Sequence, residues 1–211
     1  MLSPDRFIEH LASGEPMGGT SFKETLRGIA SIENDTKRRG MFLALLNREL
    51  EKRGERPVLL VGGFAVEIYT AGAYASEDID IKGPKKAVEA LLSEAGFTSF
   101  SNSTYGDESL SIYVQWLGEG PEAPFENRER IFDVSMGSPD LRVRIISFED
   151  LIIDRLNQAE HWKNADGFLW ARAIARAAKE AGQQLDWTYL EARATEEQTE
   201  DLFRKLREEN A

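Results

Sequence analysis

The stretch Pro57-Val-Leu-Leu-Val-Gly62-Gly63 decides the fold, together with Asp78-Ile-Asp-Ile81 shortly after it. The apolar run before the glycines predicts a short buried strand. From Phe64 onward, apolar residues recur at the spacing of a helix. The second segment alternates acidic and apolar residues, which is typical of a strand with one buried face. The sequence therefore predicts a strand, a glycine turn, a helix and a second strand in close succession.

The glycine turn is a candidate phosphate site. Gly62 and Gly63 carry no Cβ, and they stand where the backbone N–H groups of a new helix are accessible. The N-terminus of a helix is positively polarised and suits anions such as phosphate. Taken alone, a Gly-Gly pair after a strand more often forms only a tight turn.

Asp78 and Asp80 are candidate metal ligands. Because side chains alternate along a strand, we expect both carboxylates on one face and both isoleucines, Ile79 and Ile81, in the core. Two neighbouring carboxylates can share Mg²⁺ or Mn²⁺, since these cations prefer oxygen ligands. An isolated Asp-X-Asp pair is more often a solvated strand end. The strand, glycine turn and helix that precede this pair are what favour a metal site.

In combination, these segments resemble the signature of the nucleotidyltransferase superfamily. That superfamily includes DNA polymerase β, the aminoglycoside nucleotidyltransferases and nucleotidyltransferases of bacterial toxin–antitoxin systems. The resemblance lies in the order strand, Gly62-Gly63, helix and Asp78-Ile-Asp80, and it extends to small bacterial members through Asp154-Arg155 and His161-Trp162. It implies an α/β (α+β) fold with a mixed sheet core and flanking N-terminal and C-terminal helices.

The resemblance also implies a metal-dependent enzyme. Such an enzyme moves a nucleoside monophosphate from an NTP to a hydroxyl of a protein, an RNA or a small molecule. Two divalent ions, Mg²⁺ or Mn²⁺, hold the triphosphate and activate the hydroxyl. By this resemblance Asp78 and Asp80 are catalytic metal ligands, and the nucleotide-binding residues are Gly62, Gly63, Ser76, Arg155 and His161.

Three of the nucleotide-binding candidates have a second interpretation. Ser76 is either close to the nucleotide phosphates or a turn residue that bonds to the backbone, and both readings stay open. Arg155 and His161 either present charge to the ligands or form an ion pair and a helix-end contact, and we favour the contact. The loop Ala73-Tyr-Ala-Ser-Glu77 lacks the basic residue that is usual there, which weakens triphosphate binding.

Members of the superfamily carry a third acid on a neighbouring strand, and at this position the sequence departs from the superfamily pattern. The expected strand covers Ser111 to Trp116, and related small proteins carry a glutamate where this chain has Gln115. A neutral amide binds Mg²⁺ only weakly. Asp133 is the alternative catalytic acid, on a predicted strand with Ile131 and Ser135 on the same face. It is equally readable as a structural acid on a solvated edge.

This departure supports a second hypothesis, in which the protein is a binding module. A nucleotidyltransferase fold that has lost its activity would then act through its acidic surface, as an antitoxin-like partner or a regulator. A third hypothesis is a small α/β domain with a coincidental resemblance. The matching order of the elements speaks against it.

Composition narrows the class of protein. The chain has 211 residues, which is enough for a sizeable core, and no cysteine, which excludes disulfides and thiolate metal sites. The formal net charge of -11 argues against broad, non-specific nucleic-acid binding. No apolar run reaches membrane-spanning length, and the N-terminus lacks the pattern of a signal peptide. We therefore expect a cytoplasmic protein, and the resemblance implies that its partners are an NTP and an acceptor.

The chain divides into three predicted regions. We expect N-terminal helices over residues 1–56, the nucleotidyltransferase-like core over residues 57–146 and a C-terminal helical region over residues 147–211. The predicted helices cover residues 2–12, 21–29 and 35–53 before the core, and residues 149–160, 165–181, 186–193 and 196–208 after it. Gly137-Ser-Pro-Asp140 predicts a hairpin turn between two strands.

Two further groups of side chains receive structural interpretations. The basic cluster Lys37-Arg-Arg39 is interpreted as a solvated helix face. The tryptophans are interpreted as core or helix-packing residues rather than a platform for stacking bases: Trp116, Trp162, Trp170 and Trp187.

Overall fold

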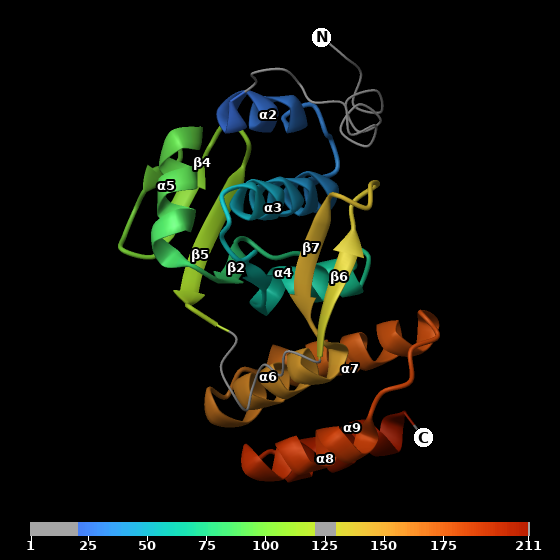
Figure 1. The fold of residues 1–211 in the computed structure, drawn as a ribbon. Coiled ribbons are helices and arrows are strands. Elements are labelled where there is room, and N and C mark those ends of the chain that lie inside the picture. The colour runs from blue at the N-terminus through green and yellow to red at the C-terminus, as the bar shows by residue number, and fades with distance from the viewer. Residues whose placement is uncertain (1–20, 121–129, 211) are drawn as a thin grey trace.

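The computed structural model of the protein describes residues 21–120 and 130–210 (Figure 1). Within these residues a seven-stranded mixed sheet has the order β3-β4-β5-β2-β1-β7-β6. The strands are β1 (Leu59–Leu60), β2 (Ile79–Lys82), β3 (Thr98–Ser99), β4 (Thr104–Asp107), β5 (Ile112–Gly118), β6 (Ile131–Ser135) and β7 (Arg142–Ile146). β2 runs parallel to β5 and antiparallel to β1, and β1 runs parallel to β7. The predicted mixed α/β fold is therefore confirmed.

Helices surround this sheet. They are α2 (Phe22–Ile29), α3 (Asp35–Lys52), α4 (Gly62–Tyr69), α5 (Lys85–Ala95), α6 (Phe148–His161), α7 (Ala165–Glu180), α8 (Trp187–Glu196) and α9 (Glu200–Glu209). In Figure 1, α6 to α9 gather beyond one end of the sheet, in red and orange, and α2 lies at the opposite end. No helix in the described ranges is long and apolar enough to cross a membrane.

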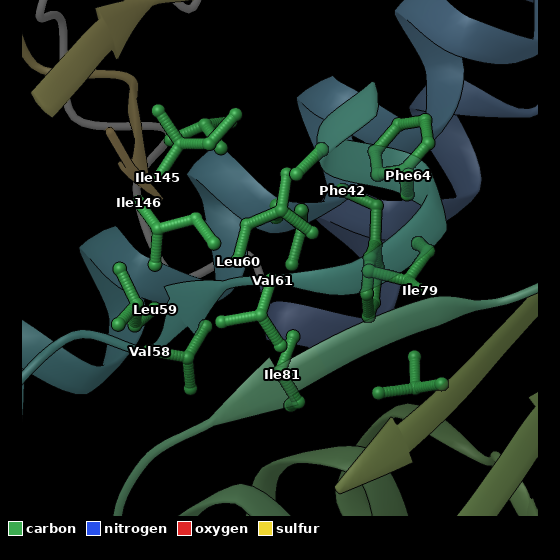
Figure 2. Close-up of a cluster of buried hydrophobic side chains, with 14 of the residues drawn as sticks. Phe42, Val58, Leu59, Leu60, Val61, Phe64, Ile79, Ile81, Ile145 and Ile146 are labelled. Atoms are coloured by element: carbon green, nitrogen blue, oxygen red, sulfur yellow. The ribbon is translucent and has the colours of Figure 1, made fainter. Parts of the chain in front are cut away.

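The core forms where the central strands meet α3 and α4. Figure 2 shows apolar side chains of β1, β2 and β7 gathered with Phe42 of α3 and Phe64 of α4. Leu60, Ile79 and Ile81 are fully buried there. Burial of the apolar strand residues explains why the short run before the glycines forms the middle of the sheet.

Most predicted elements are confirmed, with two shifts in their bounds. Strand, glycine turn, helix and second strand follow as predicted, and β6 and β7 form the predicted antiparallel hairpin. However, the polar segment from Ser101 to Glu108, whose composition predicts a turn between two strands, contains β4, and α9 begins at Glu200 rather than at residue 196. The predicted helix over residues 2–12 lies outside the described residues.

A buried amide connects α3 to two strands. Asn47 of α3 accepts a hydrogen bond from the backbone N–H of Val58 at 2.8 Å, and it donates one to the carbonyl oxygen of Arg142 at 3.2 Å. Val58 directly precedes β1, and Arg142 is the first residue of β7. The Asn47 side chain thus fixes α3 against the starts of β1 and β7.

We expect Asn47→Ala to lower the free energy of unfolding by about 1–3 kcal/mol, because it leaves the buried Val58 N–H without an acceptor. Urea denaturation measures this change. The matched control is Gln184→Ala, which removes an exposed amide before α8. Equal stability of the two variants would contradict the role of Asn47.

Candidate functional site

Asp80 lies directly against the glycine turn. The Gly63 N–H at the start of α4 donates a hydrogen bond to Asp80 Oδ2 at 3.4 Å. Gly62 has a left-handed φ of +67°, and a Cβ added there would lie 2.0 Å from the same oxygen. Gly62 is therefore required both for the turn and for the close approach of this carboxylate.

The Asp80 carboxyl group is electrostatically strained. Its pKa is raised to about 6, first by burial and then by the negative charge of Asp78. The Gly63 N–H and the positive charge of Arg155 act in the opposite direction. Asp78 and Asp80 thus form a pair of carboxylates that repel each other, and a cation placed between them would relieve the repulsion.

A buried ion pair holds the loop that carries Asp78. Arg39 of α3 and Glu67 of α4 pair at 3.1 Å. The Arg39 guanidinium also donates to the carbonyl oxygens of Ser76 at 2.8 Å and Asp78 at 2.6 Å, and it stacks 4.2 Å from the Phe64 ring centroid. Glu67 accepts a hydrogen bond from the Ser76 N–H at 2.8 Å. These contacts fix the backbone on which the two acids stand.

This network corrects the interpretation of Lys37-Arg-Arg39 as a solvated helix face. Arg39 is buried, with only 5% of its surface exposed. Its spacing on α3 places it toward the core, so it required Glu67 as a partner. The signal in the sequence was Glu67 itself, an acid in an otherwise apolar helix turn between Val66 and Ile68.

Ser76 acts as a turn residue that bonds to the backbone. Its hydroxyl donates to the carbonyl oxygen of Asp78 at 2.9 Å. It also lies beside the glycine turn, because a Cβ added at Gly63 would lie 2.7 Å from Ser76 Oγ. The structure therefore brings Gly62, Gly63, Ser76 and the two acids together.

The neighbouring strand places Gln115, not an acid, next to Asp80. In the parallel β2–β5 pair the two residues are register partners. Asp133 lies on β6, separated from β2 by β1 and β7, and it pairs with Arg144 at 3.2 Å. Asp133 therefore lies away from Asp80, which agrees with the second of its two interpretations, a structural acid on the sheet edge.

A cavity of about 520 Å³ opens beside Asp80. Sheet residues line one side of it, and α6 lines another with Asp154 and Arg155. Asp154 and Arg155 form an ion pair with each other, and the charges of both act on Asp80. The sequence analysis treated an ion pair and a contact with the ligands as alternative roles of Arg155. In the structure Arg155 forms the ion pair and also lines the cavity.

The lining of the cavity includes a buried acid that the sequence analysis did not identify. Asp150, at the start of α6, accepts a hydrogen bond from the Tyr189 hydroxyl at 2.5 Å. Burial raises its pKa to about 6, while Tyr189 and the charge of Arg193 oppose this shift. In the sequence, the position of Asp150 three residues after Ser147 indicates only a helix cap, and its partner Tyr189 lies far away along the chain.

His161 and Trp162 differ from each other in their surroundings. The His161 ring nitrogen Nε2 lies 2.8 Å from the Glu197 carbonyl oxygen, which is a contact between helix ends. His161 does not line the cavity, whereas Trp162 does, with 71% of its surface exposed. The interpretation of Trp162 as a packing residue was therefore wrong.

Asp78 and Asp80 are the residues that could hold a metal ion. Both offer carboxylate oxygens, the ligands that Mg²⁺ and Mn²⁺ prefer, and the raised pKa of Asp80 marks a place where positive charge is favourable. Within the described ranges, no group of three or more histidines, cysteines and acids is arranged to hold a metal. The pair thus fits a cation that takes its other ligands from water or substrate.

We expect Gly62→Ala to destabilise the protein more than Gly54→Ala. Both glycines have positive φ, so each substitution carries a backbone cost of about 1–2 kcal/mol. A Cβ meets Asp80 only at position 62, since nothing lies within 4 Å of one at position 54. The extra overlap should cost about 1–3 kcal/mol more in chemical denaturation. Equal losses would show that Asp80 moves aside freely.

We expect Asp80→Asn to raise stability at neutral pH in the absence of divalent ions. The folded pKa of about 6 exceeds the ordinary value of 3.8, so ionisation of Asp80 opposes folding. This cost is absent below about pH 4, grows as the pH rises to about 6 and is complete above it. The variant should therefore gain about 1–2 kcal/mol at pH 7.5 and lose this advantage near pH 4.

Thermal or urea unfolding at several pH values, with a chelator present, measures this difference. Asp140→Asn, at the exposed turn between β6 and β7, is the matched control for replacing an acid by an amide. A lower stability of Asp80→Asn at pH 7.5 would contradict the electrostatic description of the site.

Comparison with known proteins adds two distant structures. No protein-family model matches the chain, and the curated proteins contain no sequence match. The two structures are titled as the crystal structure of ANT(2″)-Ia in complex with adenylyl-2″-tobramycin and the solution structure of the antibiotic-resistance factor ANT(2″)-Ia. Each is 17% identical to this chain, with a TM-score of 0.46. The alignments cover 79% and 83% of this chain, and 95% and 92% of those chains. At this similarity the activity of those proteins does not transfer to this chain, and its function has to come from the residues of its own site.

Proposed function

We propose that the protein is a metal-dependent nucleotidyltransferase that moves a nucleoside monophosphate from an NTP to a hydroxyl of an acceptor. One observation carries this proposal: Asp80 stands against the Gly62-Gly63 turn at the wall of a cavity, and the negative charge of Asp78 acts on it. Acceptors of the three classes considered above, protein, RNA and small molecule, fit the proposal.

A divalent cation bound by Asp78 and Asp80 would neutralise the charge of the triphosphate. The residues of the chain would position the reactants around it. The helix start at Gly63 faces the carboxylate and gives the phosphates a positively polarised end of α4. Arg155, whose charge already acts on Asp80, adds positive charge on the α6 side.

In the proposed reaction the acceptor oxygen bonds to the α-phosphorus, and the bond from that phosphorus to the β-phosphate oxygen breaks. Pyrophosphate leaves, and the hydroxyl proton passes to a carboxylate. We assign this proton to Asp154, because it lines the same cavity and its charge acts on Asp80. This assignment replaces Asp133 as the additional acid.

A second function is favoured by one specific observation. Gln115 is the register partner of Asp80, at the place where a third carboxylate would complete a two-ion site. A protein that binds an NTP there without transferring it would act as a binding module, such as an antitoxin-like partner or a regulator. The two functions differ in turnover, not in nucleotide binding.

We expect purified protein to label an acceptor when it is incubated with α-labelled NTPs, Mg²⁺ or Mn²⁺ and cell lysate. Asp78→Asn and Asp80→Asn should each reduce the labelling by about a hundredfold or more, because each removes a preorganised charge at the reacting phosphate. Both variants should remain folded, since the substitution relieves repulsion.

Asp133→Asn is the matched control, an acid on the same sheet but at its edge. It should label as the parent does. Labelling that survives in Asp80→Asn would remove the pair from the mechanism. NTP-dependent thermal stabilisation without any labelling would favour the binding module.

A further inference from the structure

The carboxylate of Asp154 is held by the residue that follows it in the chain. Arg155 donates to Asp154 Oδ2 through Nε at 2.8 Å, and its Nη2 donates to the same oxygen. Consecutive residues of a helix point in different directions, so the long Arg155 side chain bends back toward its neighbour. The side chain of Arg155 is only 4% exposed, whereas that of Asp154 is 42% exposed. Arg155 is therefore the buried member of this pair, and Asp154 is the member that a ligand in the cavity can reach.

A tryptophan of α7 packs on the Arg155 guanidinium. The Cζ atom of Arg155 lies 5.4 Å from the centroid of the Trp170 ring, within the range of a cation–π interaction. Tyr74 packs edge-on against the same ring, with the two centroids 4.4 Å apart. Tyr74 belongs to the segment that leads into Asp78. Trp170 thus contacts both this segment and Arg155.

A glycine permits this approach of α7 to α6, which lie side by side in Figure 1. Gly167 and Trp170 are three residues apart, so they lie on the same side of α7. A Cβ added at Gly167 would lie 2.5 Å from the carbonyl oxygen of Arg155 and 2.9 Å from the backbone nitrogen of Ala159. The backbones of the two helices therefore meet at Gly167, and this contact brings Trp170 within reach of Arg155.

We propose that Arg155 and Trp170 are positioning residues for Asp154. Trp170 holds the Arg155 guanidinium, and the guanidinium holds Oδ2 of Asp154, so that Oδ1 is left to take the proton of the acceptor hydroxyl. This inference rests on the proposed function, in which Asp154 receives that proton. Neither positioning residue touches the reacting atoms.

Two observations favour positioning over packing alone. Both N–H groups that Arg155 directs at Asp154 use Oδ2, and no residue in the described part of the chain donates a hydrogen bond to Oδ1. Asp154 also lines the cavity that contains Asp80, and its charge acts on Asp80. A carboxylate with one fixed oxygen and one unused oxygen has a defined orientation before a substrate binds, which is what a proton acceptor requires.

NMR of the arginine side chains tests whether Trp170 holds the guanidinium. In the parent protein we expect the Arg155 Nε–H to exchange slowly with water, because this group is buried and hydrogen-bonded. Arg155→Lys identifies the signal by removing it. Trp170→Leu should speed the exchange by about tenfold, since the aromatic face is lost, whereas Trp170→Phe should stay within about threefold of the parent. This measurement requires neither a metal ion nor an acceptor.

The rate of labelling tests whether this position matters for transfer. With a saturating α-labelled NTP, Mg²⁺ and cell lysate, Trp170→Leu should slow labelling by about tenfold and Trp170→Phe by less than about threefold. Arg155→Lys should also slow it by about tenfold, because an ammonium group does not replace the fixed N–H groups of the guanidinium. This variant leaves Trp170 in place, so it tests the proposal even if Trp170→Leu does not fold.

Two controls accompany these rates. The affinity of Trp170→Leu for the α,β-methylene analogue of the same NTP, measured by calorimetry, should change by less than about twofold, because a group that acts only in the transition state changes the rate and not the binding. Trp187→Leu is the matched variant, a tryptophan of α8 that packs against Phe203 and does not line the cavity. It should label as the parent does.

A double variant separates positioning from a general structural effect. Asp154→Asn should slow labelling by about a hundredfold, because the proton acceptor is lost. Its amide oxygen can still accept from Arg155, so the packing is retained. Adding Trp170→Leu to Asp154→Asn should slow labelling no further, because the carboxylate that Trp170 positions is already absent.

Each failure has a distinct meaning. Four results would overturn the positioning role and leave the proposed function intact: unchanged Arg155 exchange in Trp170→Leu, unchanged labelling in Trp170→Leu or Arg155→Lys, a loss of analogue affinity without a loss of rate, or a further tenfold loss in the double variant. No labelling and no analogue binding by the parent would overturn the proposed function and this inference together.

Discussion

The buried ion pair between Arg39 and Glu67 is the interaction on which the site depends. Burying two charges costs free energy unless each is paired and hydrogen-bonded. Here Glu67 also accepts from Thr36 and Ser76, and the Arg39 guanidinium also donates to two carbonyl oxygens of the loop. Because these bonds join α3, α4 and the segment before β2, the loop that carries Asp78 cannot move independently of the core.

This fixed backbone explains the electrostatic state of the two acids. Asp80 is positioned by β2 and the glycine turn, and Asp78 by the loop that Arg39 holds. Neither carboxylate has a cationic side chain as a hydrogen-bond partner in the described part of the chain, so burial and mutual repulsion raise the pKa of Asp80. The fold thus retains a destabilising charge that only a bound cation or a proton would offset. Such a cost is typical of a functional site.

The sequence predicts those features of the structure that depend on neighbouring residues, and it does not predict those that depend on contacts between distant segments. The strand, the glycine turn, the helix and the alternating acids are local patterns, and they were predicted with the fold class. The placements of Arg39, Asp133 and Trp162 were not, because each depends on which distant element packs beside it. Asp133 has the alternating pattern of a site strand, and only the strand order shows that β1 and β7 separate it from β2. Ser76 stood between two readings that a single sequence could not distinguish.

The register of β7 connects the two sides of the cavity. Ile145 of β7 pairs with Leu60 of β1, immediately before the glycine turn. One residue after β7, Ser147 caps α6 by accepting a hydrogen bond from the Asp150 N–H at 3.0 Å. The acids of α6 are therefore placed relative to Asp80 by strand pairing and a helix cap, not by a long linker. Because Ser147 alone joins β7 to α6, the sheet places the α6 side of the cavity directly, and less binding free energy is lost to ordering it.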